Sequence, residues 1–119
     1  TMTERKNDKK SSEQLKAIEK YIEKNLKQAT LQQLAYELNY SYSFAGNLVR
    51  KLTGMPFTEY LQTKRLSEAS RLLTETSLSV YEISNTVGYE NESFFRRKFK
   101  ERYKDSPKRY RMKKGSNGK

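Results

Sequence analysis

The sequence of 119 residues contains no cysteine and no histidine. Without cysteine, the chain can form no disulfide bond and has no thiol nucleophile. Without histidine, it lacks the most frequent zinc ligand, the most frequent general base and the central residue of a serine–histidine triad. The carboxylates are scattered, so their spacing predicts no metal site. These absences argue against an enzyme, a metal site and a bound cofactor.

Long apolar runs are also lacking. No stretch approaches the length that spans a bilayer, and none resembles the apolar core of a signal peptide. We therefore expect an intracellular, cytoplasmic protein without a membrane partner. Only 34% of the residues are hydrophobic, which implies a thin core. Small helical subdomains tolerate a thin core because their contacts are mostly local.

Positive charge is in large excess. The chain has 25 Lys and Arg against 14 Asp and Glu, a formal net charge of +11. Such a surplus favours a polyanionic partner. The bases are concentrated near the C-terminus, at Arg96, Arg97, Lys98, Lys100, Arg102, Lys104, Lys108, Arg109, Arg111, Lys113 and Lys114.

One short pattern occurs twice. The first copy comprises Leu34, Ala35, Leu38, Asn39, Tyr40, Ser43, Phe44, Leu48, Val49, Gly54, Phe57 and Tyr60. The second comprises Ile83, Ser84, Val87, Gly88, Tyr89, Ser93, Phe94, Lys98, Phe99, Pro107 and Tyr110. Each copy has a small residue in a short helix and then, four residues later, a residue that tolerates a positive φ. This pattern predicts two helix-turn-helix motifs, whose second helices enter the major groove of DNA.

The sequence divides into five expected parts. They are a disordered linker or cloning remnant (1–11), a first helix-turn-helix subdomain (12–55), a linker helix (56–75), a second helix-turn-helix subdomain (76–112) and a flexible basic tail (113–119). Ser12 is the expected N-cap of the first helix, and Thr30 that of the second. The two recognition helices are predicted from about Ser43 to Leu52 and from about Glu92 to Arg102.

The linker helix changes its apolar face midway. Phe57, Tyr60 and Leu61 form one stripe, and Leu66, Ala69, Leu72 and Leu73 form a rotated one. A helix that serves two small cores shows such a shift. Its roughly 27 Å length approaches the roughly 34 Å between successive major-groove faces.

The second motif offers the better base-reading residues. Arg96 and Arg97 can each fork onto guanine O6 and N7. In the first motif, Ser43, Gly46, Asn47 and Arg50 are predicted to face outward, with Phe44, Leu48 and Leu52 inward. Asn47 can pair with adenine. Gly46 is compatible with neutral drift or with close backbone approach to DNA. We predict phosphate contacts from Tyr42, Arg50, Lys51, Lys98, Lys100, Lys104, Lys108 and Arg109.

The chain from about Ser12 to Arg111 resembles the DNA-binding domain of the AraC/XylS transcription regulators. The resemblance is carried by Arg65-Leu66, Ala69, Leu72-Leu73, Ile83, Gly88-Tyr89, Ser93-Phe94, Phe99-Lys100, Ser106-Pro107 and Tyr110-Arg111. It implies an all-α fold of about seven helices, with two helix-turn-helix subdomains joined by a long helix that read adjacent major grooves. Carried over by position, the base-facing residues are Ser43, Gly46, Asn47, Glu92, Ser93, Arg96 and Arg97.

The chain departs from the family at three positions. The family often has Arg at the position of Asn47, usually has Ala at that of Ser84, and usually has Gly near Lys104. We interpret the protein as a bacterial, sequence-specific double-stranded-DNA-binding regulator, an activator by resemblance, that binds as a monomer near the nucleoid. RNA polymerase is a further candidate partner, and no small-molecule ligand is expected in this segment. The alternative is a non-specific basic architectural protein.

Overall fold

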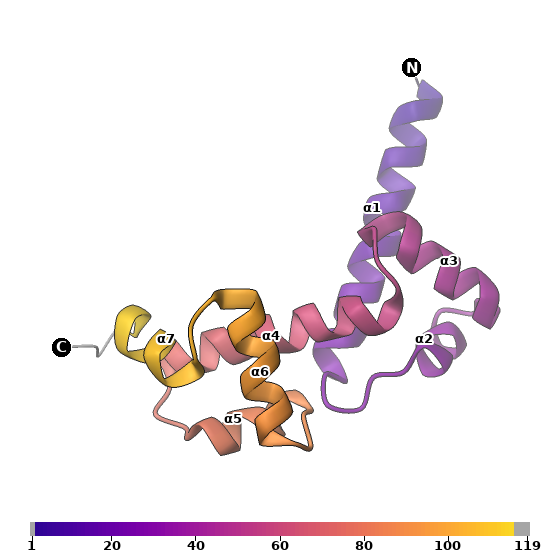
Figure 1. Ribbon diagram of the computed structural model, residues 1–119. Helices are drawn as coiled ribbons and strands as arrows, with labels where there is room; N and C mark the ends of the chain where they lie inside the picture. Colours follow the sequence, from indigo (N-terminus) through magenta and orange to yellow (C-terminus); the bar gives the residue numbers. More distant parts are fainter. Residues whose placement is uncertain (1, 116–119) are drawn as a thin grey trace. The chain divides into compact units, whose positions relative to one another are not determined.

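The computed structural model describes the backbone of residues 2–115 and the side chains of residues 9–115. Within this part of the chain, every regular element is an α-helix (Figure 1). The helices are α1 (Met2–Lys24), α2 (Leu31–Glu37), α3 (Tyr42–Thr53), α4 (Phe57–Glu75), α5 (Val80–Val87), α6 (Glu92–Tyr103) and α7 (Pro107–Lys114). The all-α class and the seven helices of the described residues agree with the fold of about seven helices that the family resemblance implied.

The chain forms two compact units. The first is Thr1–Leu61 and the second is Gln62–Lys119. Each unit contains one helix-turn-helix motif, α2 with α3 in the first and α5 with α6 in the second. The boundary falls within α4, the helix that the sequence predicted as a linker.

The first unit has a core of aliphatic and aromatic side chains from α1, the loop before α2, α2, α3 and the start of α4. The buried members are Ile18, Tyr21, Ile22, Ala29, Leu34, Leu48, Val49, Phe57, Tyr60 and Leu61. Tyr21 also connects α1 to the loop before α2. Its hydroxyl donates to the Thr30 carbonyl at 3.2 Å and accepts from the Thr30 N–H at 3.1 Å. The loop that precedes the first motif is thereby fixed to the core.

The second unit has a more aromatic core. Phe95 and Phe99 are fully buried, with ring centroids 5.9 Å apart. Phe99 also contacts Tyr103 at 4.6 Å and the edge of Tyr110 at 5.2 Å. These ring contacts hold α6 and α7 together, since tilted and edge-on pairs are favourable in addition to the area that they bury.

Helix α4 contributes to both cores, as its shifted stripe predicted. Phe57, Tyr60 and Leu61 belong to the core of the first unit. Leu66, Ala69, Leu72 and Leu73 are buried farther along the helix. The rotation of the apolar face along one helix therefore reflects the presence of two cores.

Helix α1 begins earlier than the sequence suggested. It starts at Met2, whereas Ser12 was expected to cap it and residues 1–11 were expected to be disordered. Residues 2–11 are mostly polar, but they contain neither glycine nor proline and include several good helix formers. A helix that is already nucleated by the packing of Ile18 and Ile22 can extend through such residues.

Other helix limits also differ. Helix α3 begins at Tyr42, one residue before the predicted start at Ser43, because the Ser41 hydroxyl accepts from the Phe44 N–H at 3.1 Å. Lys113 and Lys114 belong to α7 rather than to a flexible tail. Residues 116–119 of that tail lie outside the described residues. Among the described helices, none is long and apolar enough to cross a membrane.

Candidate nucleic-acid interface

The two motifs share a tight turn between their helices. Asn39 has φ 60° and Gly88 has φ 109°, so both residues adopt the left-handed conformation that the sequence predicted for them. The N–H of Tyr40 donates to the Ala35 carbonyl at 2.9 Å, and that of Tyr89 donates to the Ser84 carbonyl at 2.8 Å. These bonds close each first helix and set the direction in which the second helix leaves.

Glycine suits position 88. A Cβ atom there would lie 2.8 Å from Nε of Arg65, and the positive φ would strain any other residue. The Arg65 guanidinium also lies 6.0 Å from the centre of the Tyr89 ring. Burial lowers the pKa of Arg65 and raises that of Tyr89. Arg65 therefore packs on the turn of the second motif, a role that its sequence position alone did not reveal.

The first recognition helix, α3, exposes a short polar surface. Most of the residues predicted to contact DNA from this helix are exposed, namely Tyr42, Ser43, Asn47, Arg50 and Lys51. Gly46 is half-buried, and a Cβ atom there would point at Cδ2 of Leu31 in α2, at 3.3 Å. The side-chain direction at position 46 is thus toward α2.

Phe44 corrects the predicted inward face of α3. It was expected in the core, yet its exposed fraction is 48%. Ala45 and Val49 occupy the buried face together with Leu48. Phe44 lies in the first turn of α3, where its ring contacts that of Tyr40 at a centroid distance of 4.8 Å. Leu52, also predicted inward, is partly buried against the core.

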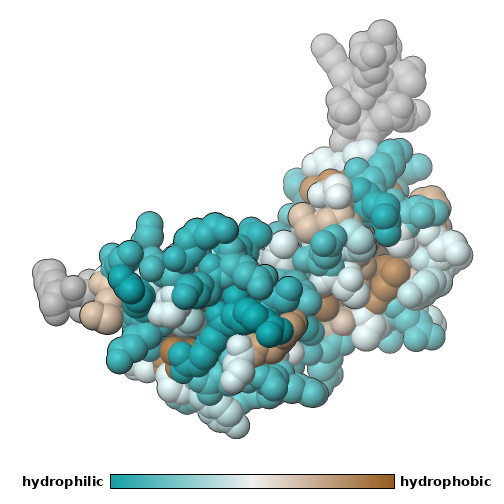
Figure 2. Space-filling model, viewed as in Figure 1, coloured by the Kyte–Doolittle hydropathy of each residue, from teal (hydrophilic) through white to brown (hydrophobic). Residues whose placement is uncertain are grey.

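The second recognition helix, α6, exposes mainly positive charge. Ser93, Arg96, Arg97, Lys100 and Arg102 are exposed, and Glu92 and Lys98 are partly exposed. The sequence of α6 contains five bases and two acids. Figure 2 shows the surface over this helix and α7 as largely hydrophilic. The predicted base-reading residues of the second motif therefore share one helix with two of its five predicted phosphate contacts, Lys98 and Lys100.

Glu92 holds Arg96 in place. The Arg96 Nε donates to Oε2 of Glu92 at 2.7 Å, and Nη2 of the same guanidinium also contacts that oxygen. The pair is spaced i,i+4, so both side chains lie on one face of α6. Two residues that were predicted separately as base readers thus form one ion pair.

Arg97 and Lys98 both flank the ring of Phe94. The Arg97 guanidinium carbon lies 5.2 Å from the ring centre, and the Lys98 Nζ lies 5.5 Å from it. Phe94 is half-buried rather than fully in the core. Its ring limits the rotation of the Arg97 side chain, since a cation over an aromatic face is attracted to it. Lys98 also pairs with Glu101 at 3.6 Å.

The bases after α6 have different roles. Lys104, Lys108 and Arg109, three of the predicted phosphate contacts, are exposed. Asp105 pairs with Arg109 at 3.9 Å and with Lys113 at 3.1 Å. These cations keep the start and the end of α7 positively charged while an acidic residue positions two of them.

Arg111 belongs to the fold rather than to a charged surface. Its guanidinium donates to the carbonyls of Leu73 at 2.9 Å, Thr76 at 3.2 Å and Leu78 at 2.6 Å. These acceptors lie at the end of α4 and in the loop before α5, where helix carbonyls lack partners within the helix. The run of bases in the sequence gave no sign of this separate function.

A complete capping box begins α5. The Ser79 hydroxyl accepts from the Glu82 N–H at 3.0 Å, and the Glu82 carboxylate accepts from the Ser79 N–H at 3.0 Å. Hydrogen bonding from the Ser79 backbone holds the pKa of Glu82 below its ordinary value. The S-x-x-E spacing could have revealed this cap in the sequence. In the described residues, no group of three or more carboxylate, imidazole or thiol side chains is placed to hold a metal ion.

Comparison with known proteins places this geometry in a family. The model of a helix-turn-helix domain family matches residues 34–113. The chain is 36% identical to the HTH-type transcriptional regulator AlkR of Acinetobacter baylyi over 101 residues, which cover 85% of this chain and 32% of AlkR. The chain spans between 28% and 33% of the length of AlkR and two further curated relatives.

Two solved structures show the same fold. The C-terminal domain of the two-component response regulator yesN from Fusobacterium nucleatum is 36% identical, with a TM-score of 0.68; the match covers 87% of this chain and 98% of that one. The DNA-binding domain of the global transcriptional factor AdpA, in complex with a target DNA, is 26% identical with a TM-score of 0.74. That match covers 83% of this chain and 89% of the AdpA chain.

Proposed function

The chain belongs to the AraC/XylS family of helix-turn-helix DNA-binding domains, and on that premise we propose that it is a sequence-specific, double-stranded-DNA-binding transcription regulator. The observation that carries the proposal is the exposure of different polar and basic residues on α3 and α6, at equivalent positions of two motifs with the same turn. A helix that enters the major groove needs such a face, because base edges are recognised by hydrogen-bonding side chains.

The proposal assigns base reading to Ser43, Asn47, Glu92, Ser93, Arg96 and Arg97, with Gly46 contributing only its backbone. It assigns phosphate contacts to Tyr42, Arg50, Lys51, Lys98, Lys100, Lys104, Lys108 and Arg109. The exposed fraction of Arg97 and Lys100 supports these roles, since both side chains are open to a ligand. Phosphate contacts position the protein on the duplex, and base contacts supply its specificity.

We further propose that the domain binds as a monomer to one asymmetric site that covers two successive major grooves. Each of the two motifs provides one recognition helix, so no dimer symmetry is needed. Footprinting would show protection in both grooves of a non-palindromic site. Protection of a single groove, or selection of a strict palindrome, would contradict this arrangement.

Within a bacterial cell, the proposed site of action is the cytoplasm, at the nucleoid, and the proposed effect is activation. The curated relatives include an F1 operon positive regulatory protein of Yersinia pestis, which is 33% identical over 98 residues. No chemical reaction is assigned to the chain. Contact with RNA polymerase would be tested by a pull-down in which nuclease removes all DNA, because DNA alone can bridge two DNA-binding proteins.

The decisive experiment is selection of bound duplexes from a random library, followed by titration of the selected duplex and of an unrelated duplex of equal length. At physiological salt, a sequence-specific regulator should bind the selected duplex ~10³-fold more tightly or better. A ratio near one would instead identify a non-specific architectural protein. Both titrations must use the same salt concentration, since phosphate contacts make every affinity depend on salt.

A further inference from the structure

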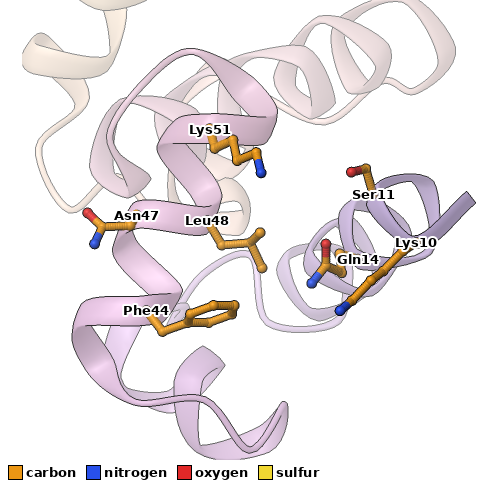
Figure 3. A pocket seen from close by; sticks show the side chains of 7 residues that line it. All are labelled: Lys10, Ser11, Gln14, Phe44, Asn47, Leu48 and Lys51. Atoms are coloured by element: carbon orange, nitrogen blue, oxygen red, sulfur yellow. The ribbon is translucent and has the colours of Figure 1, made fainter. Parts of the chain in front are cut away.

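A groove lies between α1 and α3 in the first unit (Figure 3). It has a volume of about 390 Å³ and is lined by Lys10, Ser11, Gln14, Phe44, Asn47, Leu48 and Lys51. We propose that this groove holds one phosphate–sugar strand of the duplex whose bases α3 reads, with Lys10 and Lys51 on its phosphates. This inference rests on the proposed function, and it adds α1 to the surface that contacts DNA.

The charge of the groove suits a phosphate strand. Its two charged lining residues, Lys10 and Lys51, are both lysines, one from each wall. Ser11 and Gln14 add a hydroxyl and an amide donor, and no carboxylate is among the seven lining residues. Phosphodiester oxygens accept hydrogen bonds and carry negative charge, so this set of side chains is complementary to them.

The apolar part of the groove accounts for the exposure of Phe44. Figure 3 shows the side chains of Phe44 and Leu48 directed from α3 toward α1. Nearly half of the Phe44 surface is exposed, although it is a large apolar residue in a thinly packed unit. Deoxyribose rings present apolar C–H groups between successive phosphates. An aromatic wall beside two lysines therefore matches the alternating chemistry of the strand.

The position of the groove relative to α3 supports the same occupant. Asn47, a proposed base reader, lies at its edge, and Lys51, a proposed phosphate contact, lies one turn farther along the helix. A recognition helix that enters the major groove has a phosphate strand along its side. Here the N-terminal part of α1 forms the opposite wall at that place.

This part of α1 has little role in the core. The first buried residue of α1 among the described side chains is Ile18, whereas Lys10, Ser11 and Gln14 are exposed or half-exposed. The helix nevertheless begins many residues before Ile18, at Met2. A phosphate contact gives this extension a function that core packing does not provide.

The test compares Lys10→Ala with Lys16→Ala. Both lysines are exposed on α1, and both changes remove one charge, but only Lys10 lines the groove. Six residues along an α-helix correspond to a net rotation of about 240°, so Lys16 points elsewhere. At 0.1 M salt, Lys10→Ala should weaken binding about five- to tenfold for every duplex and reduce the salt slope by about 0.9. Lys16→Ala should change affinity less than about twofold. Equal effects of the two changes would overturn the proposal.

Neutral phosphates locate the contact. Methylphosphonate groups, which carry no charge, would replace single phosphates along the duplex. Replacement beside the half-site of α3 should weaken binding of the unmodified protein, and at one or two of these positions it should no longer matter for Lys10→Ala. If no position loses its effect in this variant, Lys10 contacts no phosphate and the proposal fails.

The same measurements separate this proposal from the proposed function. Equal binding of the selected and the unrelated duplex by the unmodified protein would refute sequence-specific regulation. The comparison of Lys10→Ala with Lys16→Ala would still decide the role of the groove on either duplex, because phosphate contacts do not depend on sequence.

Discussion

The two helix-turn-helix motifs share a backbone and differ in the chemistry that they expose. Each turn has one residue in the left-handed conformation, Asn39 or Gly88, and each has the same closing hydrogen bond, donated by Tyr40 or by Tyr89. Their second helices also end alike, with Gly54 at φ 80° and Lys104 at φ 66°. On α3, however, the positions before Leu48 are Gly46 and Asn47, whereas the equivalent positions of α6 are Arg96 and Arg97. Two motifs with the same backbone therefore expose different proposed base-reading surfaces, a weak one on α3 and a strong one on α6.

The two units also fasten their motifs differently. In the first unit, the Tyr21 hydroxyl binds the backbone of Thr30 before α2. In the second unit, the Arg111 guanidinium binds three carbonyls before α5. When the two copies of the sequence pattern are aligned, Arg111 of the second unit corresponds to Leu61 of the first. Leu61 is buried in the core. The loop before the first motif is thus held by a residue of α1, and the loop before the second motif by a residue of α7.

The largest expected effect is on stability, and it tests whether the Arg111 hydrogen bonds hold the loop before α5. Arg111→Met should destabilise the second unit by about 2–4 kcal/mol, because three part-buried carbonyls lose a charged donor. Urea unfolding and hydrogen exchange should show the loss in α5 and in the end of α4, with the first unit unaffected. Arg109→Met is the matched control, since Arg109 is exposed and its guanidinium pairs with Asp105 at 3.9 Å rather than with backbone carbonyls. Equal losses in the two variants would show that general charge, not the carbonyl contacts, stabilises the unit.

The next effect tests the difference in reading strength. Arg97→Ala should weaken specific binding by about 1–3 kcal/mol and relax the preference at one or two base pairs. Asn47→Ala, at the equivalent position of α3, should cost less. Lys100→Ala should weaken all sequences alike and lower the salt slope by about 1. Binding of all three variants to a panel of single-base variants of the site provides the measurement. If Arg97→Ala left the ranking of sequences unchanged, its assignment to base reading would be wrong.

The ion pair between Glu92 and Arg96 is expected to add to the sequence specificity of α6, the stronger proposed reading surface. In the major groove, only cytosine and adenine present hydrogen-bond donors to a carboxylate. Glu92 should therefore weaken binding to sites with other bases at its position, and its ion pair should reduce the contact of Arg96 with those bases. Glu92→Ala should therefore raise affinity for unrelated duplexes and reduce the specificity ratio by about tenfold, or about 1.4 kcal/mol. Glu101→Ala is matched in charge and lies on the same helix, but its partner is Lys98. The same fall in the ratio for both variants would mean that net charge alone is responsible.

Local signals in the sequence predicted much of this architecture. Thr30, Asn39, Gly54, Gly88 and Ser106-Pro107 mark helix ends through their own backbone and hydrogen-bonding preferences, so those ends could be placed without a structure. The stripe on α4 likewise depends only on helical spacing. The shift of that stripe predicted that α4 contributes to two separate cores.

The missed features depend on contacts between distant residues. The carbonyls that Arg111 binds lie 33 to 38 residues away in the sequence, and Arg65 packs on a turn that follows a different helix. Neither residue differs in type from the solvent-exposed bases around it. The start of α1 was misplaced because polar residues with good helix propensity resemble a disordered segment in composition. The role of the individual site residues in binding DNA remains a prediction from the exposed surface.

A smaller effect tests whether the two recognition helices end equivalently. Lys104→Gly should stabilise the second unit by up to about 1 kcal/mol, because glycine adopts the left-handed conformation without a steric penalty. Gly54→Ala should destabilise the first unit by a similar amount, and a Cβ atom there meets nothing within 4 Å, so backbone strain is its only cost. Thermal melting measures both changes. Loss of the Lys104 charge should also weaken binding to every duplex. A Lys104→Gly protein that melts lower would show that the side chain of Lys104 stabilises the helix end more than its backbone strains it.

The smallest effect concerns Gly46, where the weaker motif has no side chain. An alanine in a helix interior is more stable than glycine by up to about 1 kcal/mol, but the new methyl group would lie 3.3 Å from Cδ2 of Leu31. Leu31 is half-buried at the start of α2, so its side chain can move only at the expense of some packing. We therefore expect Gly46→Ala to raise the free energy of unfolding by no more than about 0.5 kcal/mol. On a Leu31→Ala background, the same change should produce nearly the full gain.

The DNA affinity of the Gly46→Ala protein completes this test. Because the methyl group points at α2, it should not reach the duplex, and affinity should change less than about twofold, that is, by less than about 0.4 kcal/mol. Titration of the selected duplex with this variant and with Arg97→Ala makes the comparison direct. A loss of affinity without a loss of stability would place the backbone of Gly46 in close contact with DNA. If that loss exceeded the loss caused by Arg97→Ala, the first motif would contribute more than the second, and the proposed order of the two reading surfaces would be reversed.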